Sequence, residues 1–456
     1  MKHEHIIDLI DEIANTKSRN EKESILASLL NENDHLQREA KAVFLWTYSP
    51  KHDFWIKDLK TLPEGKFNES FDPDIVDAHH YTEVLKKLST REVTGSEAKQ
   101  LLSDLLYAVD TKTAELVKRI VKRDLRAGMS AKTINKVFDD LIYIHPYMRC
   151  DVLSTKTVAK LEYPCYSQLK MDGMYMDIRV YDDKVVYMTR KGSVINLNAP
   201  ERDELLIKYA SGYTLQGEAI VSGDSLESIL NRSEGNGYLN SDDIEISKVK
   251  FYVWDMIKNV DFDAKKSVVI YQERLAKVEK ACYLIGDFVE LVDTRICRNI
   301  DDVISHFKDV RSTGQEGTVV KNQFLKWKDG TSKDQLKFKV VVEADLVITG
   351  FNEGEGKFTG MVGSVICQSS DGLVEVGVSG FTDKDRRYIT DNIQQLIDEQ
   401  WIMTVKYNDV VKREGETLES LFSPRFVKLR NDKRHKENAD TLHYLKENLN
   451  TFEMFL

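Results

Sequence analysis

The 456-residue chain has few of the features that mark several classes of protein. Its five cysteines are scattered and none forms a C-x-x-C pair: Cys150, Cys165, Cys282, Cys297 and Cys367. Zinc ribbons and disulfide scaffolds are therefore not expected, and we expect a reducing, cytoplasmic environment. No apolar run approaches the roughly 20 residues that a membrane-spanning helix needs. The first residues also lack the apolar core of a signal peptide.

The chain also lacks an excess of positive charge. Its net charge is −10, which argues against a protein that coats nucleic acid by bulk charge. Local basic surfaces remain open as places for phosphate contacts. Apolar residues make up 41% of the chain, so large cores can form. At roughly 150 residues per domain, the length predicts two to four domains.

Residues 1–145 are predicted to be helical. Apolar residues recur at helical spacing at Leu101, Leu105, Leu116, Ile120 and Leu125. We expect one helix to stop at Gly128 and the next to begin with Ser130 as its N-cap.

Basic residues are concentrated between positions 118 and 136, where Asp124 is the single acid. A helix N-terminus at Ser130 with such neighbours is suited to a phosphate. The alternative is a solvated helix face. The candidate phosphate contacts are Arg123, Ser130, Lys132 and Lys136.

From Tyr163 onward short strands alternate with helices, which indicates a mixed α+β region. Residues 174–190 form a hairpin candidate around an acidic turn. Further strands are expected over 213–221, 248–257, 316–322 and 335–351, and a helix over 271–285. From about residue 341 glycines punctuate short strands, as in a small barrel. A helix over 383–399, a strand over 401–411 and a basic stretch end this region.

A lysine occupies an unusual place in the segment "YSQLKMDGMYMDIRV". Lys170 lies between apolar neighbours in a strand-like run, and a turn begins two residues later at Asp172-Gly173. A lysine can attack an electrophile only when it is neutral, which costs roughly 4.6 kcal/mol at pH 7 for an ordinary lysine. Burial and nearby cations lower that cost, so the setting favours a nucleophile.

Further short motifs follow in a fixed order. "TRKG" contains Arg190, "QGE" contains Glu218, and "YVWD" offers Trp254 as a flat surface for a base. "EGTVVK" supplies Glu316 and Lys321. In "LKFK" the lysines Lys337 and Lys339 point to one face of a strand and Phe338 to the other, which suggests an anionic ligand such as a triphosphate. "RNDK" contains Arg430, Asp432 and Lys433.

This ordered set resembles the covalent nucleotidyltransferase superfamily, and most closely the ATP-dependent DNA ligases of the T-even phage type. "RDLRAG", "INKVF", "FYVWD", "EADLVITG" and "KLRNDK" also have counterparts there, so the resemblance covers nearly the whole chain. It implies a multidomain α and α+β fold. The expected parts are an all-helical DNA-binding domain (1–148), an α+β nucleotidyltransferase domain of ATP-grasp-like type (149–341), and an OB-fold β-barrel with a tail (342–456).

The resemblance also implies roles for the motif residues. Lys170 would attack the α-phosphorus of ATP and form lysyl-AMP, which then activates the 5′-phosphate of a DNA nick. Glu218 and Glu316 would hold Mg²⁺. Contacts to the nucleotide would come from Gln168, Arg190, Glu218, Trp254, Lys321, Lys337 and Lys339. Arg430, Asp432 and Lys433 would orient pyrophosphate in the first step and then swing away about a hinge near residues 341–345.

Three positions depart from the pattern of the family. The family usually has arginine where this chain has Tyr175, aspartate where it has Gln216, and arginine where it has Thr331. Lys333 is a candidate substitute beside Thr331. An RNA ligase, a capping-type guanylyltransferase and a catalytically weakened nick-binding protein are therefore kept as alternatives. NAD⁺ is not expected, because no cysteine-rich zinc module is present.

The resemblance implies a monomer without a membrane partner that works in replication, repair and recombination, in the host cytoplasm if the source is viral. The chain ends in "ENLNTFEMFL". Phe452, Met454 and Phe455 resemble the peptides by which phage replication proteins bind a sliding clamp. The alternative is that these residues pack on the barrel.

Overall fold

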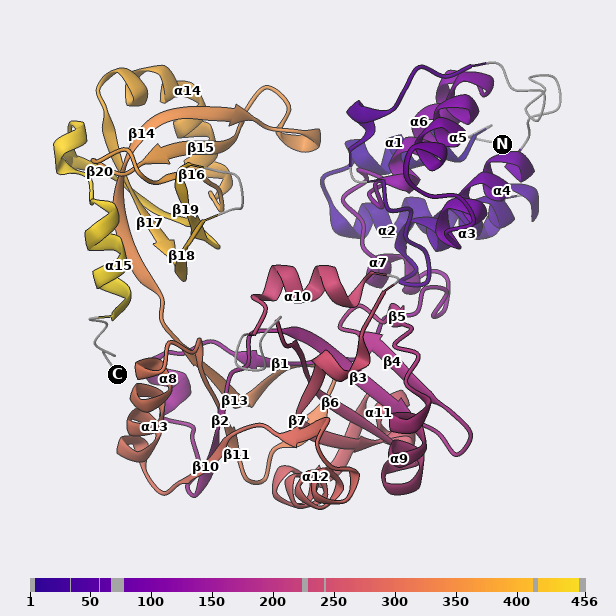
Figure 1. Ribbon diagram of the computed structural model, residues 1–456. Helices are drawn as coiled ribbons and strands as arrows, with labels where there is room; N and C mark the ends of the chain where they lie inside the picture. Colours follow the sequence, from indigo (N-terminus) through magenta and orange to yellow (C-terminus); the bar gives the residue numbers. More distant parts are fainter. Residues whose placement is uncertain are drawn as a thin grey trace. The chain divides into compact units, whose positions relative to one another are not determined.

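The computed structural model describes residues 5–32, 34–56, 58–66, 78–223, 229–241, 243–412 and 417–450. Two compact units divide the chain (Figure 1). The first comprises residues 1–147, 173–251 and 256–265, and the second comprises 148–172, 252–255 and 266–456. Each unit is therefore built from segments that are distant in the sequence. The three predicted domain boundaries stay a prediction.

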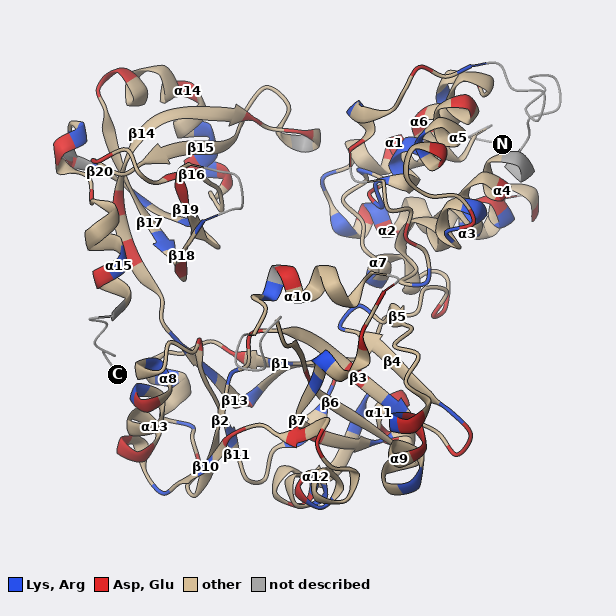
Figure 2. Cartoon of the chain, viewed as in Figure 1, with Lys and Arg blue, Asp and Glu red and all other residues tan. Residues whose placement is uncertain are grey.

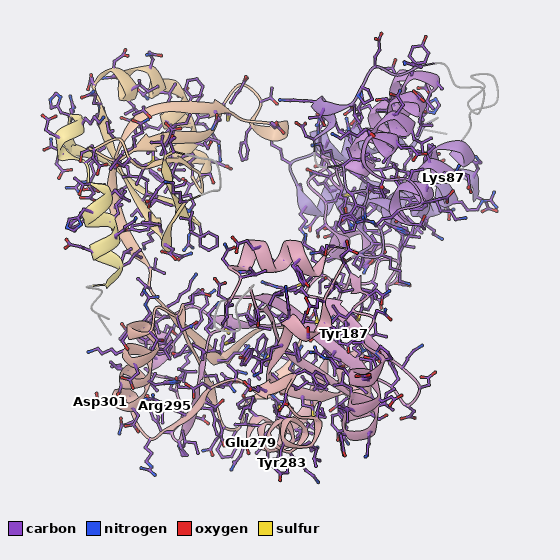
Figure 3. The ribbon with its side chains drawn as sticks, in the orientation of Figure 1. Lys87, Tyr187, Glu279, Tyr283, Arg295 and Asp301 are labelled. Carbon is purple, nitrogen blue, oxygen red and sulfur yellow. The ribbon has the colours of Figure 1, made fainter. Side chains whose placement is uncertain are left out.

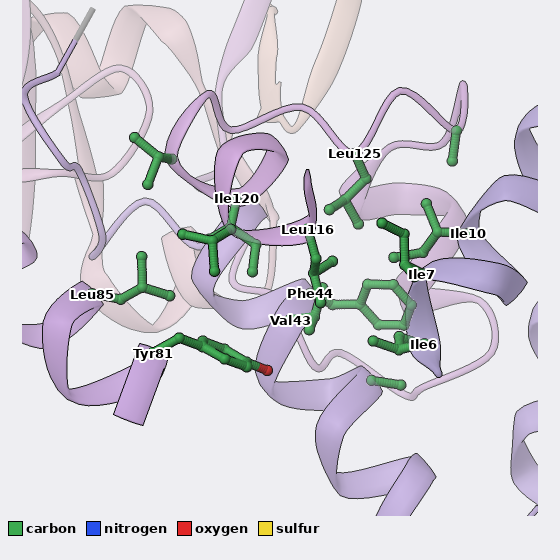
Figure 4. Packing of buried hydrophobic residues seen from close by; sticks show 14 of the residues in the cluster. Ile6, Ile7, Ile10, Val43, Phe44, Tyr81, Leu85, Leu116, Ile120 and Leu125 are labelled. Carbon is green, nitrogen blue, oxygen red and sulfur yellow. The ribbon is translucent and has the colours of Figure 1, made fainter. Parts of the chain in front are cut away.

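The first unit begins with helices and no strands among the described residues up to 147, as predicted. They are α1 (Ile6–Asn15), α2 (Arg19–Ser28), α3 (Asp34–Tyr48), α4 (Ala78–Ser89), α5 (Gly95–Ala108), α6 (Thr111–Val121) and α7 (Ala131–Asn135). Buried apolar side chains from α1, α3, α4 and α6 meet in one core (Figure 4). Phe44, Leu85 and Ile120 are fully buried there. This burial stabilises helices that are too short to form alone.

The predicted helix stop at Gly128 is wrong. Helix α6 ends at Val121, where the N–H groups of Arg123 and Asp124 donate to the carbonyls of Ile120 and Arg119. This is the Schellman pattern, and Arg123 occupies its left-handed position with φ 56. Glycine usually fills that position, so the sequence carried no stop signal. Ser130 is the N-cap of α7, as predicted, and its hydroxyl accepts from the Thr133 N–H.

Acidic and basic side chains are interspersed over the helical region (Figure 2). Several basic residues of the 118–136 segment lie in ion pairs, among them Arg119 with Asp11 at 2.6 Å and Lys136 with Glu23 at 2.7 Å. The positive charge of this segment is therefore partly compensated within the fold.

The rest of the first unit contains the larger part of a six-stranded sheet. The predicted hairpin is confirmed as β3 (Met174–Val180) and β4 (Val185–Thr189), with Val180 opposite Val185. The strand order is β5-β4-β3-β6-β7-β9, with β5 (Val194–Ile195), β6 (Tyr213–Val221), β7 (Val249–Lys258) and β9 (Val289–Leu291). Residues 252–255 of β7 and all of β9 are assigned to the second unit. Helices α9 (Pro200–Ala210), α10 (Arg232–Leu239) and α11 (Asn259–Asp263) complete the first unit.

The second unit contains a mixed five-stranded sheet in the order β1-β13-β11-β2-β10. Its strands are β1 (Met148–Asp151), β2 (Cys165–Leu169), β10 (Thr294–Cys297), β11 (Gly317–Asn322) and β13 (Gly330–Lys339). Nearby elements are α8 (Thr155–Val158), α12 (Tyr271–Ile285), α13 (Ile300–Ser312) and a small ladder of β8 (Lys266–Ile270) with β12 (Lys326–Lys328). Glu279 and Tyr283 point to solvent from successive turns of α12 (Figure 3).

The C-terminal part forms an antiparallel sheet in the order β16-β15-β14-β17-β20. The strands are β14 (Val342–Glu353), β15 (Val362–Gln368), β16 (Glu375–Val378), β17 (Trp401–Tyr407) and β20 (Arg425–Arg434). Helix α14 (Asp383–Asp398) lies between β16 and β17, the pair β18 (Asp409–Lys412) and β19 (Glu419–Phe422) lies between β17 and β20, and α15 (Leu442–Asn450) follows β20. The Phe426 N–H donates to the Ser379 carbonyl, which connects the two edge strands. Closing a sheet on itself in this way is typical of a small barrel.

Two strands expected to be continuous are each divided. The 335–351 run breaks at residues 340–341, because β13 and β14 belong to different sheets. The 401–411 run breaks at Asn408 for the same reason. Apolar periodicity does not reveal a change of sheet. No helix of the described residues is long and apolar enough to cross a membrane.

A buried ion pair attaches α12 to β7. The Arg274 guanidinium donates to both Asp255 carboxylate oxygens, at 2.7 and 3.0 Å, and both side chains are almost fully buried. Arg274 also donates to the Val269 and Leu325 carbonyls. We expect Arg274→Met to lower the free energy of unfolding by about 3–5 kcal/mol, because it leaves Asp255 buried without its partner.

The measurement is urea denaturation followed by far-ultraviolet circular dichroism. Arg295→Met is the matched control, because the Arg295–Asp309 pair is exposed (Figure 3) and should contribute less than about 1 kcal/mol. Equal losses in both variants would contradict the assignment.

Candidate active site

Lys170 follows directly on β2, which lies between β11 and β10 in the five-stranded sheet of the second unit. Its N–H donates to the Gly317 carbonyl at 2.9 Å, which extends the β2–β11 pairing to this residue. Its ammonium makes a close ion pair with Glu316, the residue just before β11, and both side chains are about one quarter exposed. The sequence placed the two residues in separate roles, as nucleophile and metal ligand, and gave no sign of this contact.

Strand register arranges the other cations relative to Lys170. Gly317 pairs with Lys339, and Val319 pairs with both Gln168 and Lys337. Paired residues of antiparallel strands point to one face, so Gln168, Lys170, Lys337 and Lys339 share a face. Phe338 is fully buried on the other face, as predicted.

Gly317 allows β11 and β13 to approach closely beside these lysines. A Cβ at this position would lie 2.2 Å from the Phe338 carbonyl oxygen, and φ is +146. Burial lowers the pKa of Lys339; the charges of Lys170 and Lys337 lower it further, and Glu316 opposes them. An anion brought among these three lysines would relieve their mutual repulsion.

Gln168 carries an unpaired acceptor. It is 1% exposed, and its amide nitrogen donates to the Thr294 hydroxyl at 3.0 Å. The Thr294 hydroxyl donates in turn to the Val292 carbonyl, which fixes the direction of the pair. The Gln168 amide oxygen is buried and has no hydrogen-bond partner in the described part of the chain. Such a group is costly unless a ligand donates to it.

Trp254 and Lys321 lie beside Tyr271, a residue that the sequence did not single out. The buried Tyr271 hydroxyl donates to the Trp254 carbonyl at 2.8 Å. The Lys321 ammonium is buried, 3.4 Å from both the Trp254 carbonyl and the Tyr271 hydroxyl. Lys321 thus supports the strand that carries Trp254.

The first unit holds a second group of motif residues. Glu218 on β6 is 9% exposed and accepts from the Gly173 N–H at 3.3 Å. A Cβ at Gly173 would lie 2.5 Å from the Ala219 carbonyl oxygen, so only glycine fits the turn after Lys170. The Arg190 guanidinium lies 4.2 Å from the centre of the Tyr147 ring.

Two of the three departures from the family pattern contact each other in this unit. The Gln216 amide donates to the Tyr175 hydroxyl at 2.7 Å and to Asp177 at 3.0 Å. Burial raises the pKa of Tyr175, so its hydroxyl stays protonated and donates to Asp177 at 2.9 Å. Beside the third departure, Thr331, the structure places Arg149 as its register partner on β1.

The "RNDK" motif lies on β20 of the barrel. Arg430 donates to Asp345 on β14 at 2.7 Å and to both oxygens of Asp432 at 2.7 Å. The hydrogen bonds that Arg430 donates to Asp432 and Asp345 raise the pKa of Arg430. The same contact lowers the pKa of Asp432 to about 2. The side chain of Lys433 lies outside the described residues.

The proposed phosphate contacts differ in their availability. Lys132 is exposed, and Ser130 caps the five-residue α7. Lys136 is exposed but ion-paired with Glu23. Arg123 donates to the Ser49 carbonyl at 2.7 Å and to the His52 carbonyl. Residues Phe452, Met454 and Phe455 lie outside the described residues.

The carboxylates suit a metal that arrives with its substrate. Among the described residues no group of three or more His, Cys, Asp or Glu side chains could hold an ion by itself. Mg²⁺ is usually bound through one or two carboxylates together with substrate phosphates. Glu218 and Glu316 each offer one carboxylate, and their role in holding Mg²⁺ stays a prediction.

Comparison with known proteins places these motifs in one family. The family model described as "ATP dependent DNA ligase domain" matches residues 148–339. The DNA ligase of Enterobacteria phage T4 is 27% identical over 94% of this chain and 96% of its own length. Residues 148–339 therefore form an ATP-dependent DNA ligase domain, and the chain as a whole is similar to the phage DNA ligases. The function of this family is nick sealing with ATP and a divalent metal such as Mg²⁺.

One further sequence relative and one solved structure are also similar to this chain. The DNA ligase of Thermococcus onnurineus is 26% identical over 60% of this chain and 53% of its own. A solved structure described as "Pmar-Lig_PreS3" has a TM-score of 0.73 at 20% identity and covers 93% of this chain and 99% of its own. The likeness extends over the helical, α+β and barrel regions, which confirms the expected fold.

The buried Lys321 yields a pH prediction. Burial is the main reason that its pKa falls from 10.5 to about 8. The charge of Arg274 lowers this pKa further, and the charge of Asp255 raises it. Between these two pH values the unfolded chain binds more protons at this residue than the folded chain. The contribution of Lys321 to the free energy of unfolding therefore rises with pH across this window, by up to about 3 kcal/mol.

The test compares urea denaturation of the wild-type chain and Lys321→Met at pH 7.5 and pH 10. The wild-type chain should gain stability relative to the variant at the higher pH. Lys326→Met, at an exposed position on β12, is the control and should show a flat difference. A flat difference for Lys321→Met as well would contradict the prediction.

Proposed function

We propose that this chain seals nicks with a 5′-phosphate and a 3′-hydroxyl in duplex DNA, through lysyl-AMP and DNA-adenylate intermediates. The observation that carries the proposal is the shared face of Lys170, Lys337 and Lys339, with Glu316 at the ammonium of Lys170. This is the arrangement that an attack on a nucleoside triphosphate requires: a nucleophile, a proton acceptor and cations for the phosphates.

In the first step the Lys170 nitrogen attacks the α-phosphorus of ATP. The Lys170 ammonium first loses one proton, which the Glu316 carboxylate is in contact to accept, and the attacking nitrogen loses a second proton to solvent. A P–N bond forms, the bond from the α-phosphorus to the bridging oxygen breaks, and pyrophosphate leaves with that electron pair. Lys337 and Lys339 offset the charge that develops on the phosphates. A bound Mg²⁺ would supply further charge neutralisation, held by Glu218 and Glu316.

The next two steps transfer AMP and release it. An oxygen of the 5′-phosphate at the nick attacks the phosphorus of lysyl-AMP, the P–N bond breaks, and Lys170 regains a proton. The 3′-hydroxyl then attacks the activated 5′-phosphorus, loses its proton, and displaces AMP. Each step exchanges one phosphorus bond for another, so no oxidant or reductant is needed.

Gln168 and Trp254 would select the base. The amide oxygen of Gln168 can accept a hydrogen bond from the 6-amino group of adenine. Guanine presents an oxygen at that position, so a second acceptor would face the first. Trp254 would stack on the base. This pattern favours ATP over GTP, and therefore a ligase over a capping-type guanylyltransferase.

The remaining predicted site residues would contact the nucleotide, pyrophosphate or DNA. Arg190 would contact the ribose or a phosphate, and Lys321 would act on the nucleotide by supporting Trp254. Arg430, Asp432 and Lys433 would orient pyrophosphate in the first step. Ser130, Lys132 and Lys136, with Arg123, would contact DNA phosphates, so binding should weaken with salt.

We further propose a monomer that acts in the cytoplasm in replication, repair and recombination, with the domain limits 1–148, 149–341 and 342–456. An RNA ligase remains the alternative, because the reaction steps are the same and the tolerance of RNA-containing nicks depends on strand contacts. A weakened nick-binding protein would bind nicks and never form lysyl-AMP.

The deciding experiment incubates the chain with Mg²⁺ and α-labelled ATP or GTP and measures label on the denatured protein. We expect label from ATP only and none with Lys170→Ala. Gln168→Leu should reduce the preference for ATP over GTP by roughly tenfold, because it removes the acceptor for the 6-amino group. Sealing of a nicked duplex, with DNA against RNA at the 3′ end, follows with the same preparations.

The controls separate chemistry from folding. Lys326→Ala, at an exposed position, should label like the wild-type chain. Absence of label from every nucleotide, in a folded chain that does not already carry AMP, would contradict the proposal and favour the nick-binding alternative.

A sliding clamp is a further proposed partner, through Phe452, Met454 and Phe455. The test needs a short truncation, because Leu449 lies in the barrel core and Asn448 donates to the Glu343 carbonyl. We expect deletion of residues 451–456 to abolish clamp binding in a pull-down while nick sealing without the clamp is unchanged. Clamp binding that survives the deletion would exclude this role.

A further inference from the structure

Arg190 lies over the ring of Tyr147 in the first unit, and Tyr147 packs edge to face on Tyr175. Its guanidinium lies 4.2 Å from the Tyr147 ring centre. The Tyr147 ring in turn meets the Tyr175 ring edge to face, with centres 5.0 Å apart and an interplanar angle of 89°. Arg190 comes from the end of the β3–β4 hairpin, whereas Tyr147 comes from the segment after the helical region. The contact therefore depends on the tertiary fold.

A buried hydrogen-bond network holds Tyr175 in place. The Tyr175 hydroxyl donates to Asp177 and accepts from Gln216, and Gln216 also donates to Asp177. The other oxygen of Asp177 meets His145 Nε2 at 2.5 Å, and His145 Nδ1 lies 3.0 Å from the Tyr143 hydroxyl. Tyr175 is thus fixed inside the unit and does not reach outward as an arginine would.

The residues at positions 175 and 216 form a chemically matched pair. The family pattern has arginine and aspartate there, one cation and one anion. On paired strands Asp177 lies opposite Gln216, so an aspartate at 216 beside Tyr175 would bury two carboxylates against each other. Tyrosine and glutamine remove both charges together and leave the net charge of this face unchanged.

We infer that Tyr147 is a positioning residue for Arg190, and that the exchange at positions 175 and 216 supplies Tyr175 as the ring against which Tyr147 packs, so that Arg190 is held ready for its phosphate or ribose contact. The support restricts the guanidinium to one direction, so less rotamer freedom is lost when ATP binds. This inference rests on the proposed function, because ATP is its ligand.

The first test is a double-mutant cycle read by ATP affinity. Calorimetry on the Lys170→Ala background measures ATP binding without chemistry. Tyr147→Leu should weaken binding about two- to five-fold, because it removes the cation–π support, and Tyr147→Phe should change it little. Arg190→Met should weaken it roughly tenfold or more. In the Arg190→Met background, Tyr147→Leu should have no further effect, because Tyr147 acts through Arg190.

The outcomes separate this inference from the proposed function. Additive effects of Tyr147→Leu and Arg190→Met, with ATP still bound, would overturn the positioning role and leave the proposed function intact. Non-additive effects without any label on Lys170 in the parent chain would support the positioning role and overturn the proposed function. Absence of ATP binding would overturn both.

The second test examines the matched exchange through stability alone. Tyr175→Arg and Gln216→Asp are made singly and together, and the urea midpoint is measured for each. We expect each single variant to lower the midpoint and the double variant to recover roughly half of the summed loss or more. Tyr175→Phe, which removes only the hydroxyl, serves if a single variant fails to fold; it should lower the midpoint less in the Gln216→Leu background. Additive losses in either cycle would overturn the matched exchange.

Discussion

The antiparallel register of β2, β11 and β13 determines where the cations of the second unit lie. Lys170 meets Gly317, which pairs with Lys339, and Gln168 pairs with Val319, which pairs with Lys337. Successive rows of this kind are separated by two residues, or roughly 7 Å along the strands. A slip of one residue in any strand would move its functional side chain to the opposite face. The absence of a side chain at Gly317 permits the close pairing on which this register depends.

Collecting lysines in one place is costly, and the fold supplies counterions and acceptors from distant parts of the chain. Glu316 pairs with Lys170, Asp255 with Arg274, and Asp345 with Arg430. Lys321 has carbonyl and hydroxyl neighbours instead of a carboxylate in contact, and burial accordingly lowers its pKa to about 8. The charge that the family uses on phosphates is thus balanced locally, in a chain whose net charge is −10.

In the sequence, Tyr175, Gln216 and Thr331 look like the loss of charged residues that the family has. In the structure these three residues have specific neighbours. Tyr175 and Gln216 are hydrogen-bonded to each other and to Asp177. Thr331 has Arg149 as its strand neighbour, whereas the sequence suggested Lys333, two residues further along the same strand. An arginine thus lies beside Thr331, close to the position where the family pattern has one. A family pattern read one position at a time cannot register such compensation.

Local order was determined by the sequence itself. Apolar alternation correctly predicted the β3–β4 hairpin, the whole of β6 and the opposite orientations of Phe338 and its neighbouring lysines, and Ser130 was recognisable as an N-cap. These features depend on residues within a few positions of one another. The order of the motifs indicated the resemblance to the family, and the proposed site residues followed from that resemblance.

Only the tertiary structure decided which side chains are partners. Glu316 lies 146 positions from Lys170, and Thr294 lies 126 positions from Gln168. The sequence also gave no sign that α6 ends before an arginine in the left-handed conformation. Nor did it show that residues 335–351 are divided between two sheets. The physical reason is that strand pairing and burial are properties of the whole chain, whereas periodicity and capping act over one or two turns.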